Sequence, residues 1–384
     1  MQAPSAFSNA EYDRRMRLLQ AELAAANLDA FAAFTSSWFR APGAVCYCCG
    51  YNSLFGSAMF LYDPASGQRH LLVDNFWDVI GRPEEEQRER EQFHLTPDLG
   101  AEVARLLPSS VRRLGLVGSR SMPAYIERSL REALAAVEIV DAAPQLNAVR
   151  EVKSDEEMAW LRFNAALSDA AATAFIAAAQ PGLSEKHVAD EALHAARRAG
   201  ADGFWTPISV ASGPRTALYY ALPTGRVLQA GEAVHMDCGV MAGGYHGDIQ
   251  RARILAGDTP PALRDLARAL VAIQDRLVQD IRPGWSAGQA AQEFARLADE
   301  AGMADYMHAH ARGGKAVVGH GIGSDGHESP DLYVGSPTLL REGMVVTLEP
   351  MLFIPGVGGA GIEDMVLITS RGGQRLTQAP RDLE

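Results

Sequence analysis

Six residues in the second half of the chain combine carboxyl and imidazole groups in a pattern suited to holding metal ions. The four acids lie in apolar, strand-like stretches, and the two histidines lie seven positions apart in the glycine-rich segment 319–330. The six are Asp237, Asp248, His320, His327, Glu349 and Glu363. A lone carboxylate buried among apolar side chains is costly, and two neighbouring carboxylates raise each other's pKa. A divalent cation removes both costs, so the pattern predicts a metal site.

The two aspartates lie on a predicted β-hairpin. Strands are expected at 233–240 and 246–254, and the turn between them contains Gly243 and Gly244. Such a hairpin would bring Asp237 and Asp248 close together. The alternative is that each aspartate caps a turn or pairs with an arginine.

The two glutamates lie in further predicted strands, Glu349 within 344–353 and Glu363 within 362–369. Oxygen-rich ligation with one imidazole suits Mn, Fe, Co or Zn and differs from a thiolate-bound structural zinc. Two such ions that share carboxylates lower the pKa of water and stabilise the oxyanion of a tetrahedral intermediate. His327 would then be available to donate a hydrogen bond or a proton.

The elements that position these residues fall into two predicted domains, 1–150 and 151–384. In the first domain, short apolar strands at 30–34, 58–62, 71–73, 114–117 and 137–141 alternate with helices at 9–26, 98–107 and 124–136. This alternation predicts an α/β domain. In the second domain, helices are expected at 155–179, 185–199, 260–281 and 286–302, and a further strand at 207–211. Ser154 and Glu157 form a capping box at the start of the first of these helices. Helices beside an antiparallel sheet predict an α+β class for the second domain.

Composition limits the partners that we expect. The chain has 384 residues, of which 47% are hydrophobic and 21% are charged, with a formal net charge of −12. An excess of negative charge argues against nucleic acid or an anionic membrane as a partner. The N-terminal stretch has no apolar core of a signal peptide, so a cytoplasmic location is expected.

Three of the four cysteines, Cys46, Cys48 and Cys49, lie in one apolar run that has neither zinc-finger spacing nor a disulfide framework. We interpret them as small buried thiols in a strand. A soft-metal or redox site is the alternative.

The motifs resemble the creatinase and methionine aminopeptidase superfamily, the pita-bread metallohydrolases of family M24. The resemblance is strongest to the two-domain branch of prolidase, aminopeptidase P and creatinase. It rests on the aspartates eleven positions apart, the GHGIG segment with His320, the HESP segment that begins at His327, the LEP motif with Glu349 and the IED motif with Glu363. Residues 45–51 and 71–73 match the first domain of that branch more loosely.

The resemblance implies a pita-bread catalytic domain with two metal ions. Asp237 would bind one ion through both oxygens, His320 and Glu349 would bind the other, and Asp248 and Glu363 would bridge the pair. Glu349 would also accept the proton of the attacking water, and His327 would stabilise the intermediate. Creatinase itself works without metal and lacks the full ligand set, so the complete set here points away from its mechanism. The smaller α/β domain would help to shape the site in a homodimer.

Three positions depart from the peptidases of this family. Tyr220 stands where they usually carry a substrate-binding histidine, Ala316 where Xaa-Pro enzymes carry another, and Gly361 where they carry an arginine. Trp205 would line a substrate pocket or pack in the core. His246 would face the site, or lie as a solvated histidine in a turn.

We therefore expect a metal-dependent hydrolase that cleaves a C–N amide or peptide bond, similar to an Xaa-Pro aminopeptidase or dipeptidase, in a short peptide or a small amide. The altered residues favour one rival, the same metals acting on a non-peptide small molecule in the manner of ectoine hydrolase or a sulfoniopropionate lyase. A catalytically silent binding relative is a second rival.

Overall fold

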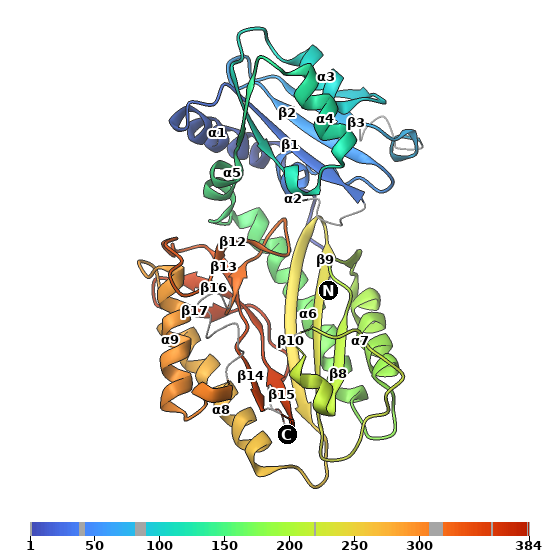
Figure 1. Cartoon of the computed structure of the whole chain (residues 1–384), viewed down its shortest axis with the longest axis vertical. Helices are drawn as coiled ribbons and strands as arrows, with labels where there is room; N and C mark the ends of the chain where they lie inside the picture. Colours follow the sequence, from blue (N-terminus) through green and yellow to red (C-terminus); the bar gives the residue numbers. More distant parts are fainter. Residues whose placement is uncertain are drawn as a thin grey trace. The chain divides into compact units, whose positions relative to one another are not determined.

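The computed structural model describes residues 2–37, 43–80, 90–218, 220–306, 318–354, 356–381 and 383. The chain forms two compact units (Figure 1). The N-terminal unit is Ala6–Arg150, and the C-terminal unit is Glu151–Glu384 together with Met1–Ser5.

A six-stranded sheet forms the centre of the N-terminal unit, in the order β4-β3-β2-β1-β5-β6. Its strands are β1 (Ala30–Ser36), β2 (Ser57–Tyr62), β3 (Arg69–Val73), β4 (Gln92–Leu95), β5 (Arg113–Val117) and β6 (Glu138–Asp141). Successive side chains of β1 enter two different cores, Phe31 into one and Ala32 into the other, because a strand alternates its side chains between faces. Helices α1 (Asn9–Ala25) and α5 (Ala143–Arg150) contribute to the first core, and α3 (Leu99–Leu106) and α4 (Ala124–Ala133) to the second. Two covered faces confirm the predicted α/β class.

The cysteine-rich run forms a short helix, α2 (Gly43–Cys49), so the strand that we expected there is wrong. The thiols of Cys46, Cys48 and Cys49 are free and buried, and burial raises the pKa of the Cys48 thiol. A short, uniformly apolar run has no periodicity that separates a buried strand from a buried helix. Packing of the whole run against the core decided the outcome.

The C-terminal unit contains two larger sheets with helices packed against each. In the first sheet, β9 (Ala233–Ala242) pairs with β10 (Tyr245–Ile254), β7 (Gly203–Phe204) and β8 (Ser209–Ser212). Helices α6 (Asp155–Ala178) and α7 (Glu185–Ala199) pack on this sheet. The capping box of Ser154 and Glu157 begins α6 as predicted, which fixes where the helix starts on the sheet.

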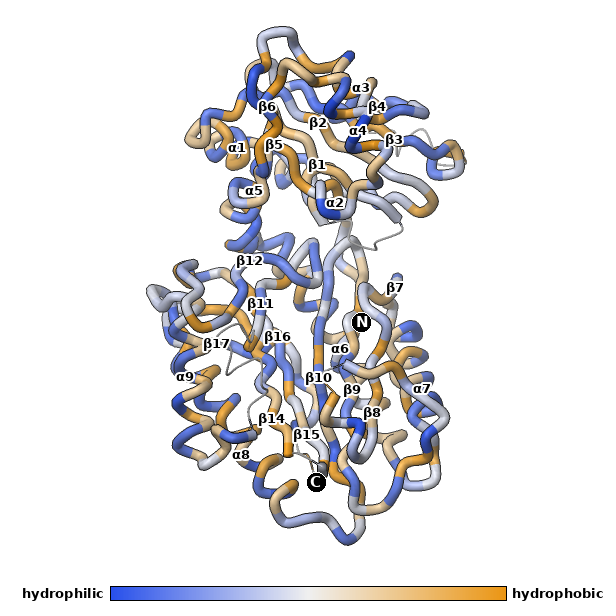
Figure 2. The backbone as a smooth tube through the Cα atoms, in the orientation of Figure 1, coloured by the Kyte–Doolittle hydropathy of each residue, from blue (hydrophilic) through white to orange (hydrophobic). Residues whose placement is uncertain are grey.

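The second sheet has the order β12-β11-β13-β16-β17. Its strands are β11 (His320–Gly321), β12 (Glu328–Asp331), β13 (Val345–Leu348), β16 (Asp364–Thr369) and β17 (Gly372–Arg375). Helices α8 (Pro261–Asp280) and α9 (Ala287–Glu300) share its hydrophobic core, and Figure 2 shows both helices with hydrophobic and hydrophilic positions interleaved. One apolar face on each helix accounts for this pattern.

The stretch predicted as one strand, 344–353, is divided between two sheets, so that prediction is wrong in its extent. β13 ends at Leu348, and β14 (Met351–Ile354) pairs with β15 (Gly358–Gly361) in a separate two-stranded sheet. Pro350 has no N–H to donate to a sheet, and the chain changes direction there. Glu349 consequently lies at a break between strands.

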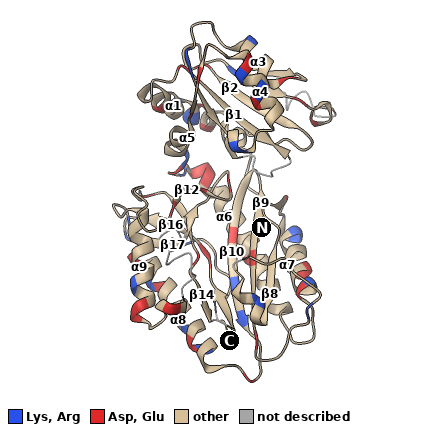
Figure 3. Cartoon of the chain, viewed as in Figure 1, with Lys and Arg blue, Asp and Glu red and all other residues tan. Residues whose placement is uncertain are grey.

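Charged positions are spread along α7, α8 and α9 of the C-terminal unit (Figure 3). Within the part of the chain that the structure describes, no helix is both long enough and apolar enough to cross a membrane.

Candidate metal centre

The hairpin of β9 and β10 places Asp237 and Asp248 on the same face of its sheet. Gly243 and Gly244 form the turn with φ values of 62° and 73°, which glycine adopts without steric cost. The register pairs Asp237 with Gln250 and Asp248 with Gly239. The two aspartates are therefore diagonal neighbours. Figure 3 shows the acidic position of β10 near mid-strand, with basic positions further along it.

His320 brings the second sheet to this face. Its Nε2 atom lies 3.8 Å from Asp248 Oδ2, 3.8 Å from Glu349 Oε1 and 4.0 Å from Glu363 Oε1. The ring is buried, and its backbone N–H donates to Thr347 Oγ1 at 3.2 Å. One ligand atom from each of Asp248, His320 and Glu363 lies within 4.8 Å of the others. Four predicted ligands, Asp248, His320, Glu349 and Glu363, thus lie close together.

Burial and mutual repulsion raise the pKa values of the acids in this cluster. Burial raises the pKa of Asp237 to about 7. Burial, followed by the charges of neighbouring carboxyl groups, raises the pKa of Asp248 and of Glu363 well above their ordinary values. Glu363 Oε1 is buried and has no hydrogen-bond partner among the described residues. A divalent cation would satisfy this oxygen and offset the repulsion.

The donor set therefore fits a hard or borderline divalent ion. Carboxylate oxygens and one imidazole nitrogen are ligands that Mn, Fe, Co and Zn accept. The neutral imidazole required of a ligand is favoured here, because burial lowers the pKa of His320 to about 3.

His327 lies beside the cluster as an exposed residue, although burial of its ring against its neighbours lowers the pKa of the imidazole. Its ring stacks on His320 with centroids 3.5 Å apart, and Trp205 contacts it edge-on at 5.6 Å. Trp205 also meets His246 edge-on at 6.2 Å and donates from Nε1 to the carbonyl oxygen of Gly247 at 3.2 Å. The indole thus packs between two histidines at the edge of the cluster.

The other residues predicted to contact substrate have mixed outcomes. His246 is buried, with Nδ1 3.1 Å from the carbonyl oxygen of Gly323, so its interpretation as a solvated turn histidine is wrong. Tyr220 is 38% exposed, and its hydroxyl lies 2.8 Å from Thr206 Oγ1. Burial, and then the charges of Asp237 and Asp248, raises the pKa of Tyr220. Ala316 lies outside the described residues.

Gln250 explains how the protein accommodates Gly361. A Cβ atom built on Gly361 would lie 1.9 Å from Gln250 Oε1, so the carboxamide fills the space that any side chain at position 361 would enter. Gln250 is buried opposite Asp237, and among the described residues its Oε1 accepts no hydrogen bond. Gln250 was not among the predicted site residues, although its spacing of two from Asp248 on a strand was a usable signal.

A buried ion pair beside His327 was also missed. Lys153 Nζ contacts Glu328 Oε1, and both side chains are at most 1% exposed. Glu328 directly follows His327 and begins β12, so this pair fixes the backbone on which His327 is carried. The two residues are 175 positions apart, and no local signal could have joined them.

Comparison with known proteins gives consistent results over both halves of the chain. The model of metallopeptidase family M24 matches residues 159–370, and that of the creatinase/prolidase N-terminal domain matches residues 15–152. Uncharacterized peptidase YqhT of Bacillus subtilis is 33% identical over 71% of this chain and 75% of its own. The Xaa-Pro dipeptidase of Pyrococcus furiosus is 32% identical over 61% of this chain and 65% of its own.

Solved structures extend the similarity to almost the whole length. The Xaa-Pro dipeptidase from Bacillus anthracis aligns with a TM-score of 0.82 at 26% identity and covers 97% of this chain and 99% of its own. The dipeptidase PepE from Mycobacterium ulcerans aligns with a TM-score of 0.82 at 26% identity and covers 99% of each chain.

Proposed function

Because the chain belongs to metallopeptidase family M24, we propose that it is a metal-dependent hydrolase that cleaves the amide bond before proline in dipeptides or other short peptides. The observation that carries the proposal is the convergence of three carboxylates on His320 Nε2, at 3.8, 3.8 and 4.0 Å, in a buried cluster. The Xaa-Pro dipeptidases among its relatives support the substrate class.

Two divalent metal ions, Mn, Fe, Co or Zn, complete the proposed site. The five proposed ligands are Asp237, Asp248, His320, Glu349 and Glu363. When bound, such ions polarise a carbonyl group and lower the pKa of water. Glu363 Oε1 has no hydrogen-bond partner among the described residues, and the pKa values of the aspartates are raised; both observations support this assignment.

Two side chains have proposed roles in the reaction itself. Glu349, whose carboxylate is 11% exposed beside His320, accepts the proton of the attacking water. His327 donates a hydrogen bond to the oxyanion that forms at the scissile carbonyl, and its exposed ring supports that role. Trp205 and Tyr220 form the proposed wall against which the substrate packs, and the buried His246 contributes to it by supporting Trp205.

The test is a turnover assay on protein from which metal has been stripped and then restored. We expect proline release from Xaa-Pro dipeptides after reconstitution with Mn²⁺ or Co²⁺, and none after chelation. Matched Xaa-Ala dipeptides are the control for specificity. Hydrolysis of both series at equal rates would contradict the proposed preference for proline.

A second candidate function keeps the metals and replaces the peptide by a non-peptide small molecule, such as a compatible-solute amide. The space beside Gly361 favours it, because Gln250 fills the space that a side chain at position 361 would enter, and this is the position where the resemblance leads us to expect an arginine. A panel of small amides, assayed beside the dipeptides, separates the two candidates. Turnover of an amide without turnover of any proline peptide would favour the second.

The organisation of the protein is part of the same proposal. We propose a cytoplasmic homodimer whose catalytic domain is 151–384 and whose smaller domain is 1–150. Sedimentation velocity tests the dimer, and fractionation of cells tests the location.

A further inference from the structure

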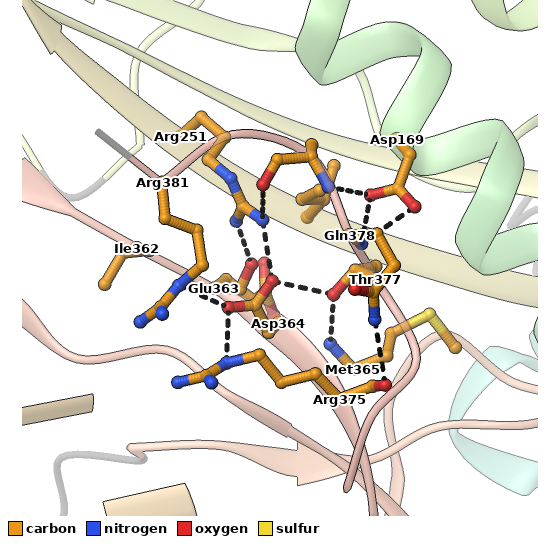
Figure 4. Close-up of polar contacts among 12 residues, drawn as sticks. Asp169, Arg251, Ile362, Glu363, Asp364, Met365, Arg375, Thr377, Gln378 and Arg381 are labelled. Atoms are coloured by element: carbon orange, nitrogen blue, oxygen red, sulfur yellow. Dashed lines mark hydrogen bonds and ion pairs between the residues drawn. The ribbon is translucent and has the colours of Figure 1, made fainter. Parts of the chain in front are cut away.

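We propose that the C-terminal segment 377–381 positions the two metal-ligating glutamates, acting through Arg251, Asp364 and Gln274. The inference rests on the proposed function, because it takes Glu349 and Glu363 to be metal ligands. Figure 4 shows the polar contacts that surround Asp364.

Arg251 joins the strand of Asp248 to the residue Glu363. Its Nη1 atom donates to the carbonyl oxygen of Gln250 at 2.9 Å and to that of Glu363 at 2.6 Å. The backbone N–H of Glu363 in turn donates to the carbonyl oxygen of Gln250 at 3.0 Å. Asp248 is two residues before Gln250 on the same strand. The guanidinium therefore holds the backbone of Glu363 against the strand that carries Asp248.

The C-terminal segment holds Arg251 in place. Nε of Arg251 donates to the carbonyl oxygen of Pro380 at 3.0 Å, and Nη2 donates to that of Ala379 at 3.2 Å. Nη2 also donates to Asp364 Oδ1 at 2.7 Å, which makes a fully buried ion pair. A buried guanidinium requires such partners, and its orientation therefore depends on the segment.

Asp364 is the point where the contacts of the segment meet. Its Oδ1 atom accepts from Thr377 Oγ1 at 2.7 Å, and Oδ2 lies 3.3 Å from Nε of both Arg375 and Arg381. Asp169, from α6, accepts from the backbone N–H groups of Gln378 and Ala379 and so joins the segment to the helix that packs on the first sheet. Figure 4 shows these contacts converging beside Glu363.

Arg381 reaches the other glutamate through Gln274. Its Nη2 atom donates to Gln274 Oε1 at 2.5 Å. Gln274 Nε2 donates to the carbonyl oxygen of Leu348 at 3.0 Å and lies 3.4 Å from that of Ile362. Leu348 and Ile362 directly precede Glu349 and Glu363, so one carboxamide holds the backbone of both.

These contacts assign a positioning role. Groups that orient metal ligands from outside typically change metal affinity by about 10–100-fold when they are removed. Arg381 is the best site to test, because its side chain is 19% exposed and its loss leaves Arg251 paired with Asp364.

The experiment compares Arg381→Ala with Asp275→Asn. Asp275 Oδ1 accepts from both Arg375 and Arg381 on their outer side, at 2.6 and 2.5 Å, and it is 40% exposed. The control therefore removes a negatively charged partner of the same two arginines and leaves their contacts with Asp364 and Gln274 in place. Affinity for Mn²⁺ is measured by calorimetry on metal-free protein, the absorption spectrum is recorded with Co²⁺ bound, and thermal melting is measured alongside.

We expect Arg381→Ala to weaken Mn²⁺ binding by about 10–100-fold and to change the Co²⁺ spectrum, while Asp275→Asn alters neither. Arg381→Lys restores the charge but not the two-pronged contact with Gln274 and Asp364. We therefore expect it to recover thermal stability while its metal affinity stays close to that of Arg381→Ala.

Glu363→Ala separates failure of this inference from failure of the proposed site. If Glu363→Ala loses metal binding and Arg381→Ala binds Mn²⁺ as the unaltered protein does, the positioning role is overturned and the site stands. Recovery of full affinity in Arg381→Lys would likewise overturn it in favour of a charge effect. Unchanged metal binding by Glu363→Ala would overturn the proposed site, and the inference with it.

Discussion

The imidazole rings of His320 and His327 are stacked, with centroids 3.5 Å apart and planes 18° from parallel. Nδ1 of His320 lies 3.0 Å from the carbonyl oxygen of Gly321, to which it donates a hydrogen bond. Nδ1 therefore carries the ring proton, and the lone pair of Nε2 faces the carboxylates. Burial, reinforced by the neighbouring His327, lowers the pKa of His320 to about 3. The stack therefore places the neutral, buried ring of His320 against the ring of His327, which is an exposed residue.

The two rings should accordingly respond differently to substitution. We expect His327→Ala to lower kcat by about 10²–10⁴-fold, because it removes a hydrogen-bond or proton donor from the reaction. Metal content, measured by mass spectrometry, should stay unchanged. His187→Ala, an exposed histidine on α7, is the control. Full activity in His327→Ala would rule out the proposed role.

Replacement of Asp248 should remove activity while the protein stays folded. We expect Asp248→Ala to abolish turnover, because it removes a proposed bridging ligand. The fold should persist, because the substitution removes the repulsion between Asp248 and the neighbouring carboxyl groups, which raises the pKa of Asp248 in the metal-free protein. Circular dichroism, metal analysis and turnover check the three parts. An active, fully metal-loaded Asp248→Ala protein would refute the site.

The stabilisation that metal provides should increase with pH. Burial raises the pKa of Asp237 to about 7. A raised folded-state pKa contributes stability that is present below the unfolded value of about 4 and is lost as the pH rises through the folded value. Metal-free protein therefore loses folding stability as the pH approaches neutral. Protons also compete less with the cation for the Asp237 carboxylate. The measurement is the difference in melting temperature between protein with and without Mn²⁺, taken between about pH 5 and pH 8. A difference that becomes smaller as the pH rises would contradict the expectation.

The glycine at 361 should be intolerant of a side chain while Gln250 is present. We expect Gly361→Ala to cost about 1–3 kcal/mol, because its Cβ would lie 1.9 Å from Gln250 Oε1. Adding Gln250→Ala should recover part of that loss in a double-mutant cycle. Gly225→Ala is the control, since nothing lies within 4 Å of its Cβ position. Denaturant unfolding supplies the free energies, and purely additive losses would show that the two positions are independent.

Glu185 should stabilise the C-terminal unit at neutral pH and lose that effect in acid. Burial acts to raise the pKa of this carboxyl, but hydrogen bonds from Thr224, Ser212 and Arg215 together lower it from 4.5. We expect Glu185→Gln to cost about 1.5–3 kcal/mol at pH 7. A lowered folded-state pKa contributes stability above the unfolded value that is lost as the pH falls through the folded one.

The difference in unfolding free energy between the Glu185→Gln and unaltered proteins should therefore shrink below about pH 4.5. Glu191→Gln, at an exposed position of the same helix, is the control and should show no such trend. A difference that is constant with pH would mean that the carboxylate charge is not the stabilising feature.

Elements with strong local signals were predicted well. The capping box of Ser154 and Glu157 predicted the start of α6, and the pair Gly243-Gly244 predicted the turn between β9 and β10. Both signals act through atoms only a few residues apart. The strand expected over the cysteines was wrong, and 344–353 was divided at Pro350, because burial and sheet membership depend on distant segments.

By itself, the sequence determined which side chains are present to bind metal, and it determined the hairpin that carries Asp237 and Asp248, because residue type and turn chemistry are local properties. Only the tertiary structure decided that His320 lies against three carboxylates, that Gln250 fills the space beside Gly361, and that the C-terminal segment surrounds Arg251. The ion pair of Arg251 and Asp364 joins residues 113 positions apart. Such contacts depend on how whole sheets and helices pack, and no local pattern encodes them.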